Sequence, residues 1–215
     1  MNIRSCFVSA TAFAAAAGIL LTGCGEDGES KDDKIAGARK GDTTSASPTA
    51  QAPDEADRPK TTFPKGVKNE FEGWKTGDKT KDAVLADVSQ TVNAVDYAIL
   101  KGDANSPTVS YYRQGEAAAS ASKWIQAWLD EDLTFVGTTR YYAPKVQMSG
   151  KNSAGVVYCA DESKAFNKNR KTGKVDKSPS GESPYVLYNT RLQKSGKGVW
   201  QTTKVLSKRG DKSCA

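Results

Sequence analysis

The 215-residue sequence contains no histidine, and this absence excludes several kinds of active site at once. Histidine is the commonest general base near neutral pH and the commonest metal ligand in proteins. A serine nucleophile activated by histidine is therefore excluded, and a zinc site would depend on the four cysteines. We expect neither a metal ion nor a cofactor.

Several short motifs that are typical of enzymes are missing as well. The chain has no glycine-rich phosphate loop, no paired-carboxylate motif, no nucleophile elbow and no C-x-x-C pair. Carboxylate chemistry stays open, and its candidate is Asp161, just past Cys159 on a predicted strand. A surface carboxylate or a turn residue is the simpler interpretation of Asp161. These absences favour a protein that is not an enzyme.

Long apolar segments are absent too, apart from one near the amino end. Arg4 precedes an apolar run over 7–21, which has the layout of a secretory signal and is shorter than the about 20 residues of a spanning helix. The run closes on Leu21-Thr22-Gly23-Cys24, which resembles the lipobox of bacterial lipoproteins. The resemblance implies cleavage between Gly23 and Cys24 and acylation of the Cys24 thiol. The alternative is a plain secretory signal with an incidental cysteine.

A polar segment rich in Gly, Ser, Thr, Pro, Asp and Lys follows this run. Such a segment cannot bury enough apolar surface to order itself. We expect a lipoprotein signal peptide over 1–23, a lipidated cysteine and flexible linker over 24–79, and one folded domain over 80–215. Two or more acyl chains would hold that domain stably on the outer face of a cell membrane. Phe63, Phe71 and Trp74 are too apolar for a pure linker, so the segment from about Thr62 could pack onto the domain edge.

Negative charge is scarce in the expected domain. The chain has a formal charge of +6, and residues 81–215 contain 20 basic and 13 acidic residues. A basic face could contact anionic lipid or cell-wall polymer, although a solvated surface is the plainer interpretation. No motif interleaves these charges with aromatics as nucleic-acid readers do, so nucleic acid is not an expected partner.

Apolar residues at spacings of three and four predict three helices in the first half of the domain. The first covers about 81–101, with Thr80 as its cap and Gly102 in the left-handed conformation at its end. Ser106 and Pro107 open a short second helix. The third covers about 116–129 and places Trp124 and Trp128 on one apolar face.

The pattern then changes to alternation, which predicts strands over 133–148, 155–161, 184–194 and 199–208. A turn at 195–198 joins the last two into a hairpin. The lysine-, asparagine-, glycine- and proline-rich segment between 165 and 183 is expected to be an exposed excursion.

The cysteines can be assigned by their places in the chain. If Cys6 leaves with the signal and Cys24 is acylated, as the lipobox resemblance implies, then Cys159 and Cys214 remain. In an exported protein, such a pair most simply forms a disulfide. A redox-active pair is disfavoured because it lacks the C-x-x-C spacing.

Aromatic side chains are the remaining candidates for a site. Core packing is their ordinary role, but buried tyrosine hydroxyls and indole N–H groups need polar partners, so a partly polar pocket between helices and sheet is plausible. The candidate pocket residues are Tyr112, Trp124, Trp128, Tyr142, Tyr158 and Asp161.

Three helices before a curved antiparallel sheet, together with Tyr158-Cys159-Ala160-Asp161, Trp200 and Cys214, resemble the nuclear transport factor 2-like (NTF2-like), or cystatin-like, cone fold. The resemblance implies an α+β domain with helices packed on a curved sheet. Members include isomerases, dehydratases and non-catalytic binding modules, and the enzymes commonly use histidine and aspartate in the cone.

Because this chain has no histidine, we expect a membrane-anchored, non-catalytic module that binds a small ligand or an envelope protein. The alternatives are an isomerase or dehydratase that uses carboxylate and tyrosine groups, with Asp161 as base, and adhesion to anionic wall polymer.

Overall fold

The computed structural model of the chain describes residues 58–177 and 181–215. The expected signal peptide, the cleavage site between Gly23 and Cys24, the lipid on Cys24 and the linker up to residue 57 lie outside the described residues. Within the described part, no helix is long and apolar enough to cross a membrane.

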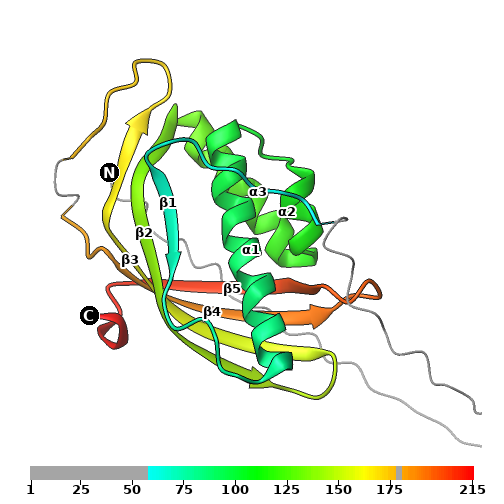
Figure 1. The fold of residues 1–215 in the computed structure, drawn as a ribbon. Helices are drawn as coiled ribbons and strands as arrows, with labels where there is room; N and C mark the ends of the chain where they lie inside the picture. The colour runs from blue at the N-terminus through cyan, green and yellow to red at the C-terminus, as the bar shows by residue number, and fades with distance from the viewer. Residues whose placement is uncertain (1–57, 178–180) are drawn as a thin grey trace, which may run out of the picture. The chain divides into compact units, whose positions relative to one another are not determined.

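Three helices lie on one face of a curved sheet (Figure 1). They are α1 (Lys79–Lys101), α2 (Pro107–Tyr112) and α3 (Gly115–Asp130). The cap of α1 is Asp78 instead of the predicted Thr80, since the Asp78 carboxylate accepts the backbone N–H groups of Thr80 at 2.8 Å and Lys81 at 3.0 Å. Gly102 ends α1 at φ 75°, in the left-handed conformation that was predicted.

The sheet contains five strands in chain order: β1 (Val67–Phe71), β2 (Leu133–Met148), β3 (Ser153–Asn169), β4 (Tyr185–Lys194) and β5 (Trp200–Arg209). The last four are antiparallel, and β4 and β5 form the predicted hairpin. The prediction of an α+β fold with helices on a curved sheet is confirmed. The sheet is not purely antiparallel, because β1 pairs with β2 in parallel.

β1 lies in the segment that was expected to be linker, so the folded part begins earlier than residue 80. Val67 is buried, Asn69 and Phe71 are partly buried, and the residues between them are exposed, which is the alternation of a strand with one face on a core. Phe71 and Trp74 pack against the core. The linker prediction was wrong for 58–78, but the expectation that the segment from about Thr62 packs onto the domain is confirmed at Phe71 and Trp74.

β3 is longer than the predicted strand over 155–161 and includes part of the expected excursion. Its second half, up to Asn169, pairs with the first half of β2. The strands approach closely at Gly137, where an added Cβ atom would lie 2.0 Å from the Lys164 carbonyl oxygen. Lysine-rich sequence can form a strand here because a charged side chain on an exposed strand face costs little.

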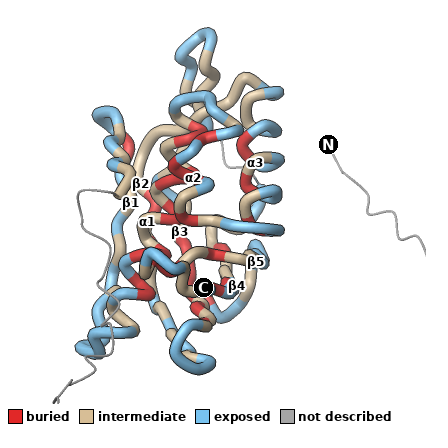
Figure 2. The backbone as a smooth tube through the Cα atoms, turned by 90° about the vertical axis from the view of Figure 1, so that its right-hand side faces the viewer, coloured by how far each residue is buried: buried red, intermediate tan, exposed pale blue. Residues whose placement is uncertain are grey.

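The core consists of two clusters, one between α1 and the sheet and one among the three helices, and Figure 2 shows that α3 is exposed along its outer side. Trp200 and Tyr112 are the largest fully buried side chains. The predicted apolar face of α3 is wrong at Trp124, whose side chain is 57% exposed. The predicted disulfide joins Cys159 to Cys214 across a Cα–Cα distance of 5.6 Å, and so ties the carboxyl end to β3.

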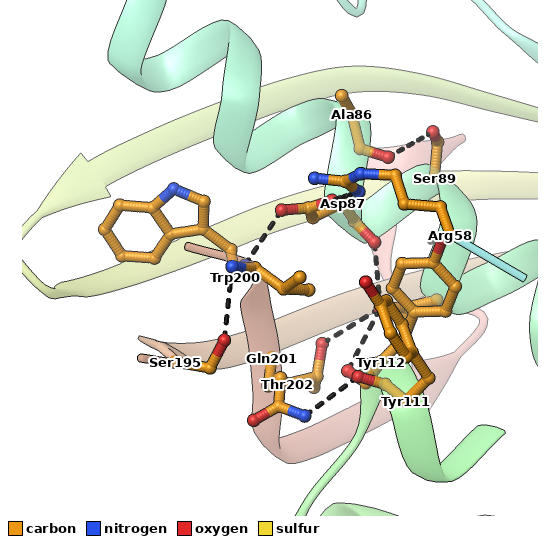
Figure 3. Close-up of polar contacts among 12 residues, drawn as sticks. Arg58, Ala86, Asp87, Ser89, Tyr111, Tyr112, Ser195, Trp200, Gln201 and Thr202 are labelled. Atoms are coloured by element: carbon orange, nitrogen blue, oxygen red, sulfur yellow. Dashed lines mark hydrogen bonds and ion pairs between the residues drawn. The ribbon is translucent and has the colours of Figure 1, made fainter. Parts of the chain in front are cut away.

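Arg58, at the start of the described chain, is held by a buried carboxylate of α1 (Figure 3). Its guanidinium forms an ion pair with Asp87, and the second Asp87 oxygen accepts the backbone N–H of Trp200 at 2.8 Å. Asp87 is 1% exposed, so these two donors compensate the cost of burying its charge. This contact fastens the beginning of the folded segment to α1 and β5.

Candidate functional site

A cavity of about 360 Å³ lies between the helices and the concave face of the sheet. Residues of α1, α3 and all four antiparallel strands line it, together with one residue that follows α2. The lining residues on the helical side are Val92, Val95, Asp96, Arg113, Ser120, Ala121 and Trp124. Those on the sheet side are Tyr141, Tyr158, Glu162, Val186, Tyr188, Val205, Ser207 and Arg209.

Three tyrosines from adjacent strands form an aromatic floor in this cavity: Tyr141, Tyr158 and Tyr188. Tyr158 and Tyr188 are directly paired across β3 and β4, and their rings stack with centroids 5.1 Å apart. The Tyr141 ring meets the Tyr158 ring edge-on at 6.1 Å. Phe71 stacks behind Tyr141 at 5.2 Å, so β1 supports the floor from the side.

The hydroxyl groups of this floor are neutral and have no protein partner in the described segments. Burial raises the pKa of Tyr141, Tyr158 and Tyr188, so none of them ionises near neutral pH. Across residues 58–177 and 181–215, no hydrogen bond joins any of the three hydroxyls to another residue. Each hydroxyl can therefore donate to, or accept from, a molecule in the cavity.

Asp96 brings a carboxyl group into the cavity from α1. Burial raises its pKa to about 7, although the Asn69 side-chain amide opposes that rise by donating to Asp96 Oδ2 at 2.6 Å. Asn69 belongs to β1, so the strand that the sequence did not reveal orients the Asp96 carboxyl group. A carboxyl group with such a pKa exchanges its proton near neutral pH, which is the property that an acid or base in a site requires.

Arg113 brings a positive charge that no carboxylate neutralises directly. It follows α2 with extended backbone angles, and its backbone N–H donates to the Val109 carbonyl at 2.8 Å. Its Nε is buried without a hydrogen-bond partner, and no ion pair reaches its guanidinium from any residue that the structure describes. Burial lowers the pKa of Arg113, yet guanidinium groups keep their charge in proteins.

The two other charged residues of the cavity neutralise each other. Arg209 Nη2 lies 2.7 Å from Glu162 Oε2, and Arg209 Nη1 donates to the Ser183 carbonyl at 3.0 Å. Glu182 lies a further 3.5 Å from Arg209 Nε. The Arg209 side chain is therefore already bonded within the protein, whereas no described residue bonds the Arg113 side chain.

Only two of the six predicted pocket residues line the cavity, namely Trp124, at its exposed rim, and Tyr158, in its floor. Tyr112 and Trp128 pack instead in the core cluster among the helices. Tyr142 faces away from the cavity, where its hydroxyl donates to the Cys214 carbonyl.

Asp161 is also on the far side of the sheet, so its predicted role as a base is wrong. Successive side chains of a strand point to opposite faces, and Tyr158 and Glu162 both line the cavity. Burial would raise the pKa of Asp161, but hydrogen bonds from Ser163 and Arg140 outweigh burial and lower it. A carboxylate with a lowered pKa is a poor general base.

The sequence analysis missed all four charged groups of the cavity, including Asp96 and Arg113, the two that form no ion pair in the described structure. A signal for Asp96 was present, because it follows Val95 and comes four residues after Val92 on the predicted apolar stripe of α1. Arg113 gave no signal of its own. The side chains of the described residues form no group of three or more carboxylate or cysteine ligands that could hold a metal ion.

No protein-family model matches the chain, and no curated protein does either. Among solved structures, the fold is similar to a ketosteroid isomerase-like protein from Erwinia carotovora atroseptica, with 16% identity over 60% of this chain and 95% of that one, at a TM-score of 0.40. A putative ketosteroid isomerase from Shewanella frigidimarina is 17% identical over 64% and 99% of the two chains, at a TM-score of 0.34. The intermembrane-space region of the chloroplast protein ARC6 is 10% identical over 63% of this chain and 99% of that one, at a TM-score of 0.38. No conclusion about activity follows from likenesses as low as these.

Proposed function

We propose that this domain binds a small, partly apolar molecule in the tyrosine-floored cavity and catalyses no reaction on it. The observation that supports this proposal is the lining itself. It combines a continuous aromatic surface with a partly buried arginine and three tyrosine hydroxyls that have no hydrogen-bond partner among the described residues. Ligand sites typically have this make-up, with a mostly apolar wall and a few convergent polar groups.

The size of the cavity fits such a ligand. A volume of about 360 Å³ is at the lower end of the roughly 300–1,000 Å³ of small-molecule sites. Its walls include residues of both core clusters, such as Tyr158 and Val95, which are held by the packing of the helices on the sheet.

The experiment compares two neighbouring substitutions on α3. Ser120 is exposed and lines the cavity, so Ser120→Trp would fill the opening at little cost to the fold. Ala119 is also exposed but does not line the cavity, so Ala119→Trp is the matched control. Native mass spectrometry of the protein purified from its own cells should show a copurifying molecule in the wild type and in Ala119→Trp, and none in Ser120→Trp. A molecule retained equally by both variants would contradict the proposal.

We also propose that the domain is held on the outer face of a membrane by acyl groups on Cys24. The support is the lipobox-like sequence Leu21-Thr22-Gly23-Cys24 after an apolar run of signal length. A Cys24→Ser variant should leave the membrane fraction, and the intact mass of the wild type should show acylation. Full membrane retention of Cys24→Ser would refute the anchor.

A second candidate function rests on Asp96. A carboxyl group whose pKa is about 7, in a cavity with three neutral tyrosines, could move a proton α to a carbonyl group, as an isomerase or dehydratase requires. Wild type and Asp96→Asn should then differ in the rate at which small ketones exchange protons in deuterated buffer. Equal rates for both proteins across a panel of ketones would eliminate the enzyme and leave the binding function.

A further inference from the structure

The charges inside the cavity indicate which kind of ligand it takes. Four ionisable side chains, apart from the tyrosines, line it, and Glu162 and Arg209 are paired with each other at 2.7 Å. That leaves Arg113 and Asp96, which form no ion pair with each other in the described structure. Because burial favours the neutral form of Asp96, the residues that line the cavity carry an excess of positive charge near neutral pH.

Arg113 is a partly buried arginine that has no ion-pair partner among the described residues, which makes it unusual. Native proteins pair nearly all buried charges, and an uncompensated one is among the most destabilising features that a core can contain. The Nε atom of Arg113 is buried and unbonded, while the rest of the side chain borders the cavity. An anion delivered by a ligand would supply the missing partner.

We propose that the cavity recognises a monocarboxylate with an apolar body, the carboxylate pairing with the Arg113 guanidinium and the body lying on the tyrosine floor. This inference rests on the proposed binding function and specifies its ligand. A guanidinium presents a planar fork of donors that matches the two oxygens of a carboxylate. One arginine matches one negative charge, so a dianion such as a phosphate monoester would bring a second charge that no described cation of the cavity is free to pair.

The apolar part of the lining accounts for the rest of the ligand. Val92 and Val95 of α1 face the cavity opposite the rings of Tyr141 and Tyr158. A flat or linear hydrocarbon group between these surfaces would remove apolar area from water on both sides. The neutral tyrosine hydroxyls can donate further hydrogen bonds to the carboxylate, since none of them is bonded within the described residues.

The test uses three pairs of probes that differ only in charge: 4-phenylbutyrate, 2-naphthylacetate and decanoate, each against its primary amide. Each pair is titrated by calorimetry and by two-dimensional NMR into four forms of the full chain. These are the wild type, Arg113→Gln, Arg113→Lys and the control Arg140→Gln, which removes an arginine from the opposite face of the sheet. Circular dichroism and thermal melts establish that each variant is folded.

The expected result is a preference for acid over amide of about 10-fold or more in the wild type, because a charge-assisted hydrogen bond is worth that much. Arg140→Gln should keep this preference, Arg113→Lys should keep part of it, and Arg113→Gln should lose it. The comparison of acid with amide on the wild type needs no variant, so a misfolded Arg113→Gln would leave the inference fully testable.

Two other results would overturn the inference in distinguishable ways. If acids and amides bind equally well and shift the resonances of cavity residues, the cavity binds ligands but Arg113 does not select a carboxylate. If no probe shifts a cavity resonance at about 1 mM, where even weak ligands of this size bind, then the proposed binding function fails as well.

Discussion

Replacing Arg58 with alanine should destabilise the folded domain, although Arg58 lies in a segment whose composition resembles a linker. The substitution would leave the Asp87 carboxylate with only the Trp200 backbone N–H as a partner (Figure 3). Removing one partner of a fully buried ion pair costs about 3–5 kcal/mol, and an exposed pair is worth about 0–1 kcal/mol. Because the Asp87 side chain is 2% exposed and that of Arg58 is 25% exposed, we expect a loss of about 2 kcal/mol.

Urea unfolding, followed by tryptophan fluorescence and extrapolated linearly to water, measures this loss. Arg58→Lys keeps the charge and should recover about half of it. The control is Lys68→Ala, which removes a partner of Glu70 from an ion pair whose side chains are 65% and 45% exposed, and it should change the free energy of unfolding by less than about 0.5 kcal/mol. If Arg58→Ala is no less stable than Lys68→Ala, then Arg58 does not compensate the buried carboxylate.

Three further predictions concern the covalent link, the sheet and the cavity. Replacing both cysteines of the disulfide with serine should lower the free energy of unfolding by about 4 kcal/mol, because the bond closes a loop with a sequence separation of 55 residues. Equilibrium unfolding in urea measures this loss. A change under about 1 kcal/mol would show that loop closure does not stabilise the fold to this extent. Gly137→Ala should lower the free energy of unfolding by about 3 kcal/mol, since its φ of 103° is strained for alanine and the new Cβ would lie 2.0 Å from a backbone oxygen. The control Gly155→Ala should lower it by less than about 1 kcal/mol in the same assay, because the nearest atom to that Cβ is 3.6 Å away. For Asp96, whose pKa rises from 3.8 in the unfolded chain to about 7 in the fold, the folded state holds the proton more tightly. The free energy of unfolding should therefore fall by at most about 4 kcal/mol between pH 4 and 7 and stay constant above pH 7. Asp96→Asn should flatten this profile. A profile that the substitution leaves unchanged would show that the pKa of Asp96 is not raised in the fold.

Regular periodicity made much of the fold predictable. The apolar stripe of α1, the proline that opens α2, the glycine that ends α1 and the turn between β4 and β5 each depend on neighbours in the sequence, and all were found in the structure. The disulfide was predictable for a different reason, because the other two cysteines had been assigned to the amino end.

β1 could not be predicted because its stability comes from a partner far away in the chain. Five residues with only two strongly apolar side chains become a strand by pairing with residues 137–141 of β2. The local alternation of Val67 and Phe71 does not identify that partner.

The candidate site was predicted poorly for a related reason. Choosing Asp161 required knowing which face of β3 is concave, and a strand's alternation gives two faces without saying which one meets the helices. Asp96 could have been found, as a carboxylate beside an otherwise apolar stripe. Arg113 could not, since its importance lies in a buried Nε atom that no described residue bonds in the fold.

A crystal structure of the chain with 4-phenylbutyrate would show whether the Arg113 guanidinium receives a carboxylate. We predict a phenyl ring on the floor formed by Tyr141, Tyr158 and Tyr188, and a carboxylate at about 2.7–2.9 Å from the Arg113 guanidinium. A probe bound outside the cavity, or bound inside it with its carboxylate directed away from Arg113, would contradict that prediction.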